Sequence, residues 1–261
     1  MTKRDIQSSR AIVSGASSGI GRELARELAR QGARVVGIAR REERLRELAE
    51  EIAAEGGRME LVVGDVTDPA TRQRAVQAAQ SRFGGLDILV NNAGIGATGL
   101  FEDADPDRLR RIMEVNFFSL VEMIRLALPL LKQGTRPIVV NVGSILGHRG
   151  TPHSSEYCAS KFAVQGFSEA IRAEFTRHSI DVLVVSPGTT QTEFFDNVIE
   201  STGGPSWPEH AAVSAAQVAR KTVRAIRTGR HEIIPYRWGK VLCWLNRLSP
   251  RLVDRMMARY A

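Results

Sequence analysis

The chain has 261 residues and a formal net charge of +7, from 36 Lys and Arg against 29 Asp and Glu, and 43% of its residues are apolar. These proportions are those of a globular protein, and they exclude a disordered, collagen-like or low-complexity chain. The length favours a single domain. Two cysteines, Cys158 and Cys243, cannot form a disulfide framework, so a reducing, cytoplasmic compartment is expected.

The first ten residues are polar, and no apolar segment of the kind found in secretory signals follows them. The apolar stretches, such as 180–185, are much shorter than the roughly 18 residues that a helix needs to cross a bilayer. We therefore expect neither a secretory signal nor a membrane-spanning segment.

Short β-branched runs alternate with segments of helical periodicity along almost the whole chain. The expected strands lie at 10–14, 34–39, 59–63, 86–90, 138–142, 181–185 and 232–234. The expected helices follow the glycine-rich segment 15–21 and lie at 41–55, from 68, at 105–131, at 155–177 and around 213–226. Strands separated by helices require crossover connections, so this order predicts an α/β fold: a Rossmann-type, doubly wound parallel sheet in a three-layer αβα sandwich. We place this single domain at 1–235 and a helical C-terminal extension at 236–261.

The first strand leads into the sequence SGASSGIG, which opens the first helix. Glycines allow a sharp turn and a close approach of the backbone to a pyrophosphate, and the free N–H groups of a helix start favour an anion. Because the glycines follow a strand and open a helix, they predict a dinucleotide site. The residues expected to form it are Gly15, Ser17, Ser18, Gly19, Ile20 and Gly21. A tight turn without a ligand is the alternative.

Two arginines, Arg40 and Arg41, stand at the end of the second strand, where folds that prefer NAD place an Asp or Glu on the ribose 2′-OH. A guanidinium can instead bind a 2′-phosphate bidentately, so the sequence favours NADP(H) over NAD(H) as the cofactor. Arg22 is a further candidate for the same pocket. The alternative for Arg41 is a solvated residue at a helix start.

Ser144 ends the fifth strand, and Tyr157 and Lys161 lie one helical turn apart in the next helix. A phenol exchanges protons poorly at neutral pH, but an adjacent ammonium lowers its pKa. Tyr157 is therefore the candidate general acid and base, and Lys161 is the group expected to lower its pKa. Ser144 would orient a carbonyl or hydroxyl oxygen of the substrate.

Taken together, these segments resemble the short-chain dehydrogenase/reductase family over about residues 8–235. The matching segments are SGASSGIG at 14–21, GDVTD at 64–68, NNAG at 91–94, Asn116, Ser144, Tyr157 with Lys161, and Pro187 and Gly188 followed by Thr192. The resemblance implies an NADP(H)-dependent oxidoreductase that interconverts a ketone or aldehyde and an alcohol by hydride transfer. The alternatives are a non-catalytic NADP(H)-binding regulator and a membrane-surface scaffold.

The resemblance also implies roles for residues outside the glycine-rich segment. Those expected to line the cofactor, from the adenine to the nicotinamide, are Asp65, Val66, Asn91, Asn92, Ala93, Gly94, Pro187, Gly188 and Thr192. Tyr157 and Lys161 would contact the nicotinamide ribose, and Asn116 would hold a water that links Lys161 to solvent in a proton relay. Alternatively, Asn116 caps or kinks its helix and Asp65 shapes a turn.

The chain departs from the family pattern at two places. Ser14 stands where the family more often has threonine, a change that keeps a hydroxyl. The AspGlyGly segment with which the 3-oxoacyl carrier-protein reductases make tetramer contacts is absent from the sequence, which therefore favours neither that tetramer nor an acyl-carrier substrate. We expect a homo-oligomer, either a dimer or a tetramer.

The segments expected to border the substrate are 94–99, 145–155 and a lid at about 187–210. The lid carries Phe194, Phe195 and Trp207, which favour an apolar small-molecule carbonyl or alcohol as substrate. His148 and His153 lack the spacing of metal ligands, so no metal site is expected, and a second general acid is the alternative role for them.

The C-terminal segment 236–261 carries six basic residues and one acid, and therefore five of the seven net positive charges. Its apolar residues recur at helical spacing, with a break at Ser249, the expected N-cap, and Pro250, the expected first helical residue. The spacing of four predicts one basic stripe, formed by Arg247, Arg251, Arg255 and Arg259. Such a helix packs on its own domain or on a second subunit, or it makes a peripheral contact with an anionic membrane surface. No nucleic-acid recognition motif is present, so no nucleic-acid partner is expected.

Overall fold

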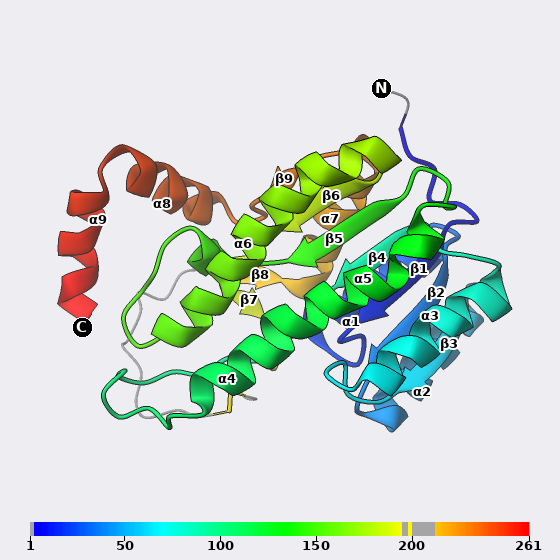
Figure 1. The fold of residues 1–261 in the computed structure, drawn as a ribbon, viewed down its shortest axis with the longest axis horizontal. Coiled ribbons are helices and arrows are strands. Elements are labelled where there is room, and N and C mark those ends of the chain that lie inside the picture. Colours follow the sequence, from blue (N-terminus) through cyan, green and yellow to red (C-terminus); the bar gives the residue numbers. More distant parts are fainter. Residues whose placement is uncertain (1–2, 195–197, 200–211, 261) are drawn as a thin grey trace.

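The structure is a computed structural model that describes residues 3–194, 198–199 and 212–260. Its centre is a seven-stranded sheet in the order β3-β2-β1-β4-β5-β6-β9, in which all neighbours are parallel (Figure 1). The strands are β1 (Arg10–Ser14), β2 (Arg34–Ala39), β3 (Arg58–Val63), β4 (Ile88–Asn91), β5 (Ile138–Val142), β6 (Asp181–Val185) and β9 (Glu232–Ile233). The doubly wound parallel sheet predicted from the sequence is confirmed, and the predicted strands differ from the observed ones by at most two residues at either end.

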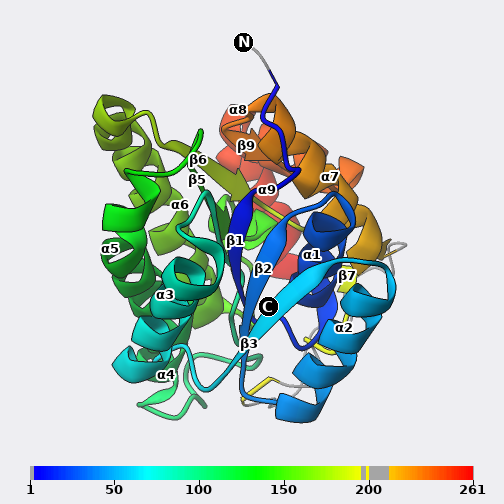
Figure 2. The ribbon, with the colours of Figure 1, turned by 90° about the vertical axis from the view of Figure 1, so that its right-hand side faces the viewer.

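Helices cover both faces of the sheet, as Figure 2 shows in a view along its edge. One face carries α1 (Gly19–Arg30), α2 (Glu42–Ala54) and α7 (Ala215–Thr228), and the other carries α3 (Pro69–Phe83), α5 (Ser119–Leu131) and α6 (Ser155–Phe175). Alternate strand residues enter the two cores, so Val13 packs with α1 and α2 while its neighbour Ile12 packs with α3 and α5. Both faces are buried, which is why the strands are continuous β-branched runs. The three-layer αβα sandwich is confirmed.

The segment predicted as one helix at 105–131 is not a single α-helix. It consists of α4 (Arg108–Met113), a π-helical turn η1 (Glu114–Phe118) and α5. A π-turn accommodates one extra residue within a helix and is frequent at functional sites, and Asn116 lies inside this one. Periodicity alone does not distinguish such a turn from a continuous helix.

The helix predicted from 68 begins with the expected cap. The Asp68 side chain accepts hydrogen bonds from the backbone N–H groups of Ala70 and Thr71, both at 3.1 Å, and Pro69 is the first helical residue. The helix predicted at 155–177 ends at Phe175 and continues as the 3-10 turn η3 (Thr176–His178). A second sheet of β7 (Thr190–Gln191) and β8 (Val213–Ser214) was not predicted.

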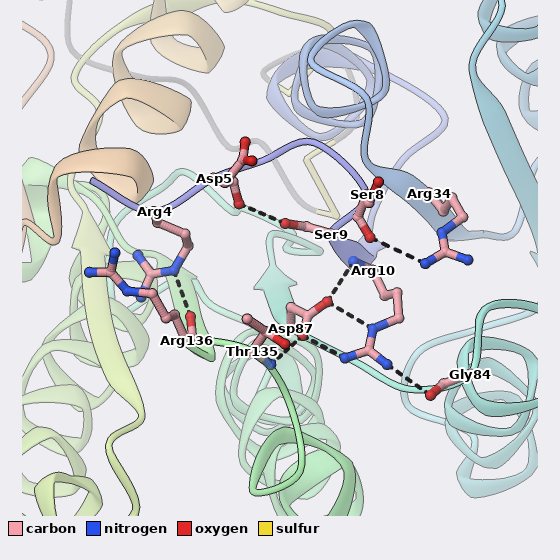
Figure 3. A network of polar contacts seen from close by, with 10 residues as sticks. All are labelled: Arg4, Asp5, Ser8, Ser9, Arg10, Arg34, Gly84, Asp87, Thr135 and Arg136. Carbon is pink, nitrogen blue, oxygen red and sulfur yellow. Dashed lines mark hydrogen bonds and ion pairs between the residues drawn. The ribbon is translucent and has the colours of Figure 1, made fainter. Parts of the chain in front are cut away.

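A polar network holds the amino ends of the strands, opposite the edge where the predicted site residues gather (Figure 3). The buried Arg4 donates to the carbonyl oxygen of Arg136 at 2.6 Å and to the carboxylate of Asp181 at 2.6 Å. The Asp87 carboxylate accepts from the Arg10 guanidinium at 2.7 and 2.8 Å and from the N–H of Thr135 at 2.6 Å. These contacts tie the start of the chain to β1, β4, β5 and β6.

The C-terminal extension forms α8 (Arg237–Leu248) and α9 (Pro250–Met257), followed by the 3-10 turn η4 (Ala258–Tyr260). The predicted break is confirmed, with Ser249 as the N-cap position and Pro250 first in α9, although within the described residues the Ser249 side chain makes no capping hydrogen bond. The two helices run in different directions (Figure 1), so the prediction of one continuous arginine stripe is wrong: Arg247 belongs to α8, and the stripe restarts with Arg251 on α9. In the described part of the chain, no helix is both long and apolar enough to cross a membrane.

Candidate active site

The site lies at the carboxyl ends of the neighbouring strands β1 and β4, where the strand order reverses; this switch point of a doubly wound sheet is the usual place for a ligand. Gly15, with φ +69°, and Gly19, with φ +54°, adopt backbone conformations that favour glycine. A Cβ on Gly21 would lie 2.2 Å from the carbonyl oxygen of Gly15, so this position also requires glycine. The turn therefore brings the amino end of α1 to the carboxyl edge of the sheet.

Ser14 and Asn92 clamp the glycine loop. The Ser14 hydroxyl accepts from the N–H groups of Asn92 at 3.0 Å and Ala93 at 3.1 Å, and the Asn92 amide donates to the Ser14 carbonyl oxygen at 3.0 Å. The departure to serine at this position thus keeps the hydroxyl contacts. The Asn91 amide instead donates to Asn141 at 2.9 Å, so Asn92 is the residue of the pair whose side chain reaches the glycine loop.

An arginine cluster adjoins the start of α1. Arg41 donates to the hydroxyl of Ser18 at 2.6 Å and to that of Ser17 at 3.3 Å. Among the described residues, the Ser18 side chain makes no capping bond to an N–H group of α1, and N–H groups at a helix start favour an anion. Arg41 and Arg44 also bind the carboxylate of Glu193, at 3.0 and 2.6 Å. Arg44 and Glu193 were not predicted, because only the fold brings the segment after Thr192 to the start of α2.

The other predicted phosphate ligands, Arg40 and Arg22, pair with other residues. Arg40 is largely exposed and pairs loosely with Asp65, at 3.7 Å. The Asp65 carboxylate accepts from the N–H and hydroxyl of Thr67, so it shapes a turn, while its expected place beside the adenine stays a prediction. Arg22 pairs with Glu51 of α2 at 2.8 Å and does not share the contacts of Arg41.

Ser144, Tyr157 and Lys161 come together at the carboxyl end of β5. Ser144 precedes the 3-10 turn η2 (Ile145–Gly147), and its hydroxyl accepts from the N–H of Leu146 at 3.1 Å. Tyr157 is hydrogen-bonded to Ser144. The Lys161 ammonium lies 5.6 Å from the centre of the Tyr157 ring and donates to the carbonyl oxygen of Val142 at 3.0 Å. The first two turns of α6 therefore present the phenol and the ammonium on one side, as predicted.

Burial is the main cause of the pKa shifts in this cluster. Burial raises the pKa of Tyr157, and the hydrogen bond to Ser144 only partly opposes that shift. Burial also lowers the pKa of Lys161 to about 8. Lys161 is not among the groups that shift the pKa of Tyr157 here, so its expected lowering of that pKa stays a prediction.

Asn116 joins the site to α6. Its amide oxygen accepts from the N–H of Ile95 at 2.8 Å, and its amide nitrogen donates to the carbonyl oxygen of Ile95 and the hydroxyl of Ser160, both at 3.0 Å. Gly94 passes close by, since a Cβ there would lie 3.2 Å from the Asn116 oxygen and 3.7 Å from the Lys161 nitrogen. The fully engaged side chain of Asn116 thus fixes the segment 94–95 beside Lys161.

Aromatic and glycine residues form the apolar wall of the site. The Phe194 ring lies 5.6 Å from the Tyr157 ring, centre to centre, and a Cβ on Gly96 would lie 2.9 Å from Phe194. Of the three predicted lid aromatics, Phe194 is therefore at the site, whereas Phe195 and Trp207 lie outside the described residues.

The segment after β6 closes the site from the other side. The carbonyl oxygen of Pro187 accepts from the N–H of Ile145 at 3.0 Å, and a Cβ on Gly188 would lie 2.7 Å from the ring of Tyr236. Thr192 packs on the glycine loop, since a Cβ on Gly19 would lie 3.0 Å from its methyl group. Tyr236, which was not predicted at the site, is thus part of the wall behind Gly188.

The two candidate histidines, His148 and His153, contact other segments of the fold. His148 is half-buried, and its ring contacts the carboxylate of Glu232 in β9 at 2.8 Å and the hydroxyl of Ser186 at 3.2 Å. His153 has φ +59°, and its carbonyl oxygen accepts from the N–H of Gly99. In the part of the chain that is described, no three His, Cys, Asp or Glu side chains gather as metal ligands.

Comparisons with known proteins agree with this geometry. The family model described as short chain dehydrogenase matches residues 9–203. A Bos taurus protein named "Dehydrogenase/reductase SDR family member 7B" is 33% identical over 267 residues, which cover 98% of this chain and 82% of the relative. A "3-ketodihydrosphingosine reductase" from Bacteroides thetaiotaomicron is 35% identical over 240 residues, covering 91% and 83% of the two chains.

Solved structures show the same fold. A short chain dehydrogenase/reductase from Burkholderia phymatum, in complex with NAD, superimposes with a TM-score of 0.87 at 23% identity, covering 95% of this chain and 96% of that one. A short chain dehydrogenase from Burkholderia cenocepacia, in complex with NADP, gives a TM-score of 0.78 at 29% identity, covering 88% and 97%. The solved relatives thus include one complex with each nicotinamide cofactor.

Proposed function

The chain belongs to the short chain dehydrogenase family, and on that premise we propose that it is an NADP(H)-dependent oxidoreductase that interconverts an apolar ketone or aldehyde and its alcohol. The observation that carries the proposal is the convergence of Ser144, Tyr157 and Lys161 beside a glycine loop whose close approaches leave no room for side chains. A regulator without activity would have no need for this set.

The residues that would hold the cofactor follow the carboxyl edge of the sheet. The glycine loop and the start of α1 would receive the pyrophosphate, and Arg41 with Arg44 would receive the 2′-phosphate. Asp65 and Val66 would border the adenine, and Gly188 and Thr192 the nicotinamide. When bound, the nicotinamide supplies or accepts the hydride.

The protein's own contribution is a positioned proton. The raised pKa of Tyr157 keeps the phenol protonated at neutral pH, so it is ready to donate to the oxygen of a bound carbonyl in the direction of reduction. Ser144, which is hydrogen-bonded to Tyr157, would donate a hydrogen bond to the same carbonyl oxygen of the substrate and orient it. Lys161, with a pKa lowered to about 8, would return the proton to Tyr157, and the Asn116 clamp holds the adjoining segment in place.

The apolar character of the substrate rests on the wall formed by Phe194 beside Tyr157. A relative whose name specifies a 3-keto reductase is consistent with a ketone as the oxidised partner. Oxidation of NADPH with a panel of ketones, steroids and sugars would identify the substrate.

Replacement Tyr157→Phe tests the mechanism, because it removes only the hydroxyl and keeps the ring against Phe194. Turnover should fall on the order of 100- to 10,000-fold, the contribution typical of general acid catalysis, while the affinity for NADPH stays unchanged. Tyr260→Phe, outside the site, is the matched control and should retain full turnover. Full activity in Tyr157→Phe would refute the mechanism, and NADPH binding with no turnover of any carbonyl would favour the regulator.

Two further expectations stay predictions. A homo-oligomer is tested by light scattering of the purified chain, and a cytoplasmic location by fractionation of its cells. Neither is needed for the chemistry proposed above.

A further inference from the structure

We propose that α8 and α9 form a docking surface for an anionic lipid membrane. Helix α8 has apolar side chains on two opposite faces. One face packs on the domain through Gly239 and Cys243, which are buried. The other face is exposed although it is apolar, with 65% of Trp238, 53% of Val241, 68% of Trp244 and 69% of Leu248 accessible to solvent; these positions are three or four residues apart and share one side of the helix.

Helix α9 also carries exposed apolar side chains. Val253 and Met257 are buried and anchor this helix, whereas Leu252 and Met256, each one residue earlier, are exposed. An exposed apolar helix face such as that of α8 is unusual on a soluble monomer and marks a contact site. Two exposed tryptophans favour a lipid interface, where an apolar ring and a polar N–H group are accommodated together.

The charge of the C-terminal extension indicates which partner binds the surface of α8 and α9. All six basic residues of the segment are exposed: Arg237, Lys240, Arg247, Arg251, Arg255 and Arg259. Its single acid, Asp254, pairs with Arg149 of the domain at 2.7 Å. An exposed apolar face bordered by arginines and lysines is the pattern of a helix that lies in the plane of an anionic membrane surface.

A second copy of this chain fits the same surface less well. A two-fold dimer places one surface against itself, so the six cations of each copy would face those of the other. Anionic headgroups neutralise these cations and the acyl region receives the apolar side chains, so both features are satisfied by one partner.

The surface is joined directly to the catalytic segments. Asn246 of α8 donates to the carbonyl oxygen of His148 and accepts from Arg149, both at 3.1 Å, in the segment that follows Ser144. A Cβ on Gly239 would lie 2.8 Å from Ile145. Helices α8 and α9 therefore lie at the end of the molecule toward which the strands run (Figure 1). Docking would bring the active site to a membrane surface in which apolar ketones concentrate. This consequence for the substrate rests on the proposed function, whereas the docking of α8 and α9 does not.

Vesicle flotation of the full chain tests the proposal, with vesicles of phosphatidylcholine alone and vesicles that also contain phosphatidylglycerol. The parent chain should float only with the anionic vesicles, and salt should weaken the binding. Its tryptophan emission should shift to the blue on binding. The first test variant removes the apolar face, through Trp238→Ser, Trp244→Ser and Leu248→Ser. The second removes three charges, through Arg247→Gln, Arg251→Gln and Arg255→Gln.

The charge variant has a matched control of equal net charge, made by Arg82→Gln, Arg110→Gln and Arg125→Gln, three exposed arginines on other helices. Because each basic residue near an anionic surface contributes roughly fivefold, the charge variant should lose on the order of 100-fold in partitioning. The control should keep the affinity of the parent. Tyr157→Phe should float like the parent, so a failure of the proposed chemistry leaves this test intact.

Three results would overturn the proposal. The first is the absence of flotation by the parent chain. The second is equal flotation of the parent and both test variants. The third is a dimer that becomes monomeric in the apolar-face variant while the parent ignores vesicles, which would assign the surface to a second copy of this chain. Unchanged thermal unfolding of the variants excludes misfolding as the cause of a loss.

Discussion

The arginine cluster beside the glycine loop leads to a prediction about cofactor choice. Arg41 and Arg44 both bind the Glu193 carboxylate, so a 2′-phosphate that reaches these arginines competes with an internal anion. Hydrogen bonds from Arg44 and Arg41 hold the pKa of Glu193 below its usual value, so the carboxylate stays charged at neutral pH. Glu193→Gln should therefore strengthen the binding of NADP⁺, and Arg41→Gln should weaken it.

The magnitudes follow from exposure. The side chains of Arg41, Arg44 and Glu193 are 40 to 42% accessible to solvent, so their ion pairs are screened. An exposed pair contributes at most about 1 kcal/mol, which is roughly fivefold in Kd, and Glu193→Gln removes two such pairs, so its gain is limited to roughly 30-fold. A hydrogen bond to a charged group contributes about 1.5 kcal/mol at the lower end, so Arg41→Gln should raise the Kd for NADP⁺ on the order of tenfold.

Calorimetric titration with NADP⁺ and NAD⁺ at one ionic strength measures both effects. The Kd for NAD⁺ should be the same in the parent and in both variants, because NAD⁺ lacks the phosphate. Arg46→Gln, one helical turn beyond Glu42 and paired with it, is the control for charge and should leave both constants unchanged. An equal loss of NADP⁺ and NAD⁺ affinity in Arg41→Gln, or weaker NADP⁺ binding in Glu193→Gln, would refute the reasoning.

Three other changes have defined outcomes. Burial lowers the pKa of Lys161 to about 8 in the folded chain, against about 10.5 in the unfolded chain. Between these two pH values the unfolded chain binds more protons than the folded one, so the free energy of unfolding rises with pH. Lys161→Met should thus raise Tm more at neutral pH than at high pH while abolishing turnover, and a pH-independent change would contradict this. Gly21→Ala should destabilise the chain and abolish cofactor binding, because the added Cβ would lie 2.2 Å from the carbonyl oxygen of Gly15. Gly166→Ala should instead stabilise α6 by about 0.5–1 kcal/mol, because the added Cβ would meet no neighbouring group within 4 Å. Burial opposes ionisation of Asp87, but its hydrogen bonds, mainly with Arg10, outweigh burial and lower the pKa of the carboxyl group. The ionised carboxylate therefore stabilises the fold above the unfolded-state pKa, and this stabilisation disappears as the pH falls through the folded-state pKa. Asp87→Asn should lower the free energy of unfolding by about 2 kcal/mol at neutral pH in urea titrations, with a smaller difference in acid; an equal loss at both pH values would contradict this assignment.

Much of the fold and of the candidate site could be predicted from local sequence patterns. The strands at 10–14 and 34–39 are β-branched runs bounded by polar residues, and they are observed without change. The spacing of Tyr157 and Lys161 requires only the geometry of one helical turn, and the glycine loop requires only a strand followed by a helix. The break at Ser249 and Pro250 follows from the missing N–H group of proline. Each of these depends on residues close together in the chain.

The tertiary structure decided what depends on distant residues and on burial. Glu193 meets Arg41 and Arg44 only because the segment after β6 crosses to the start of α2. Burial is the main cause of the raised pKa of Tyr157, and the spacing of residues in the sequence does not reveal burial.

The C-terminal extension shows the same division. Its six basic residues and its apolar spacing are properties of the sequence alone. Which side of α8 is buried, and which leaves Trp238 and Trp244 in solvent, depends on the contacts of Gly239 and Cys243 with the domain. Periodicity identifies a helix with apolar faces, but only packing against the rest of the chain determines which face stays available to a partner.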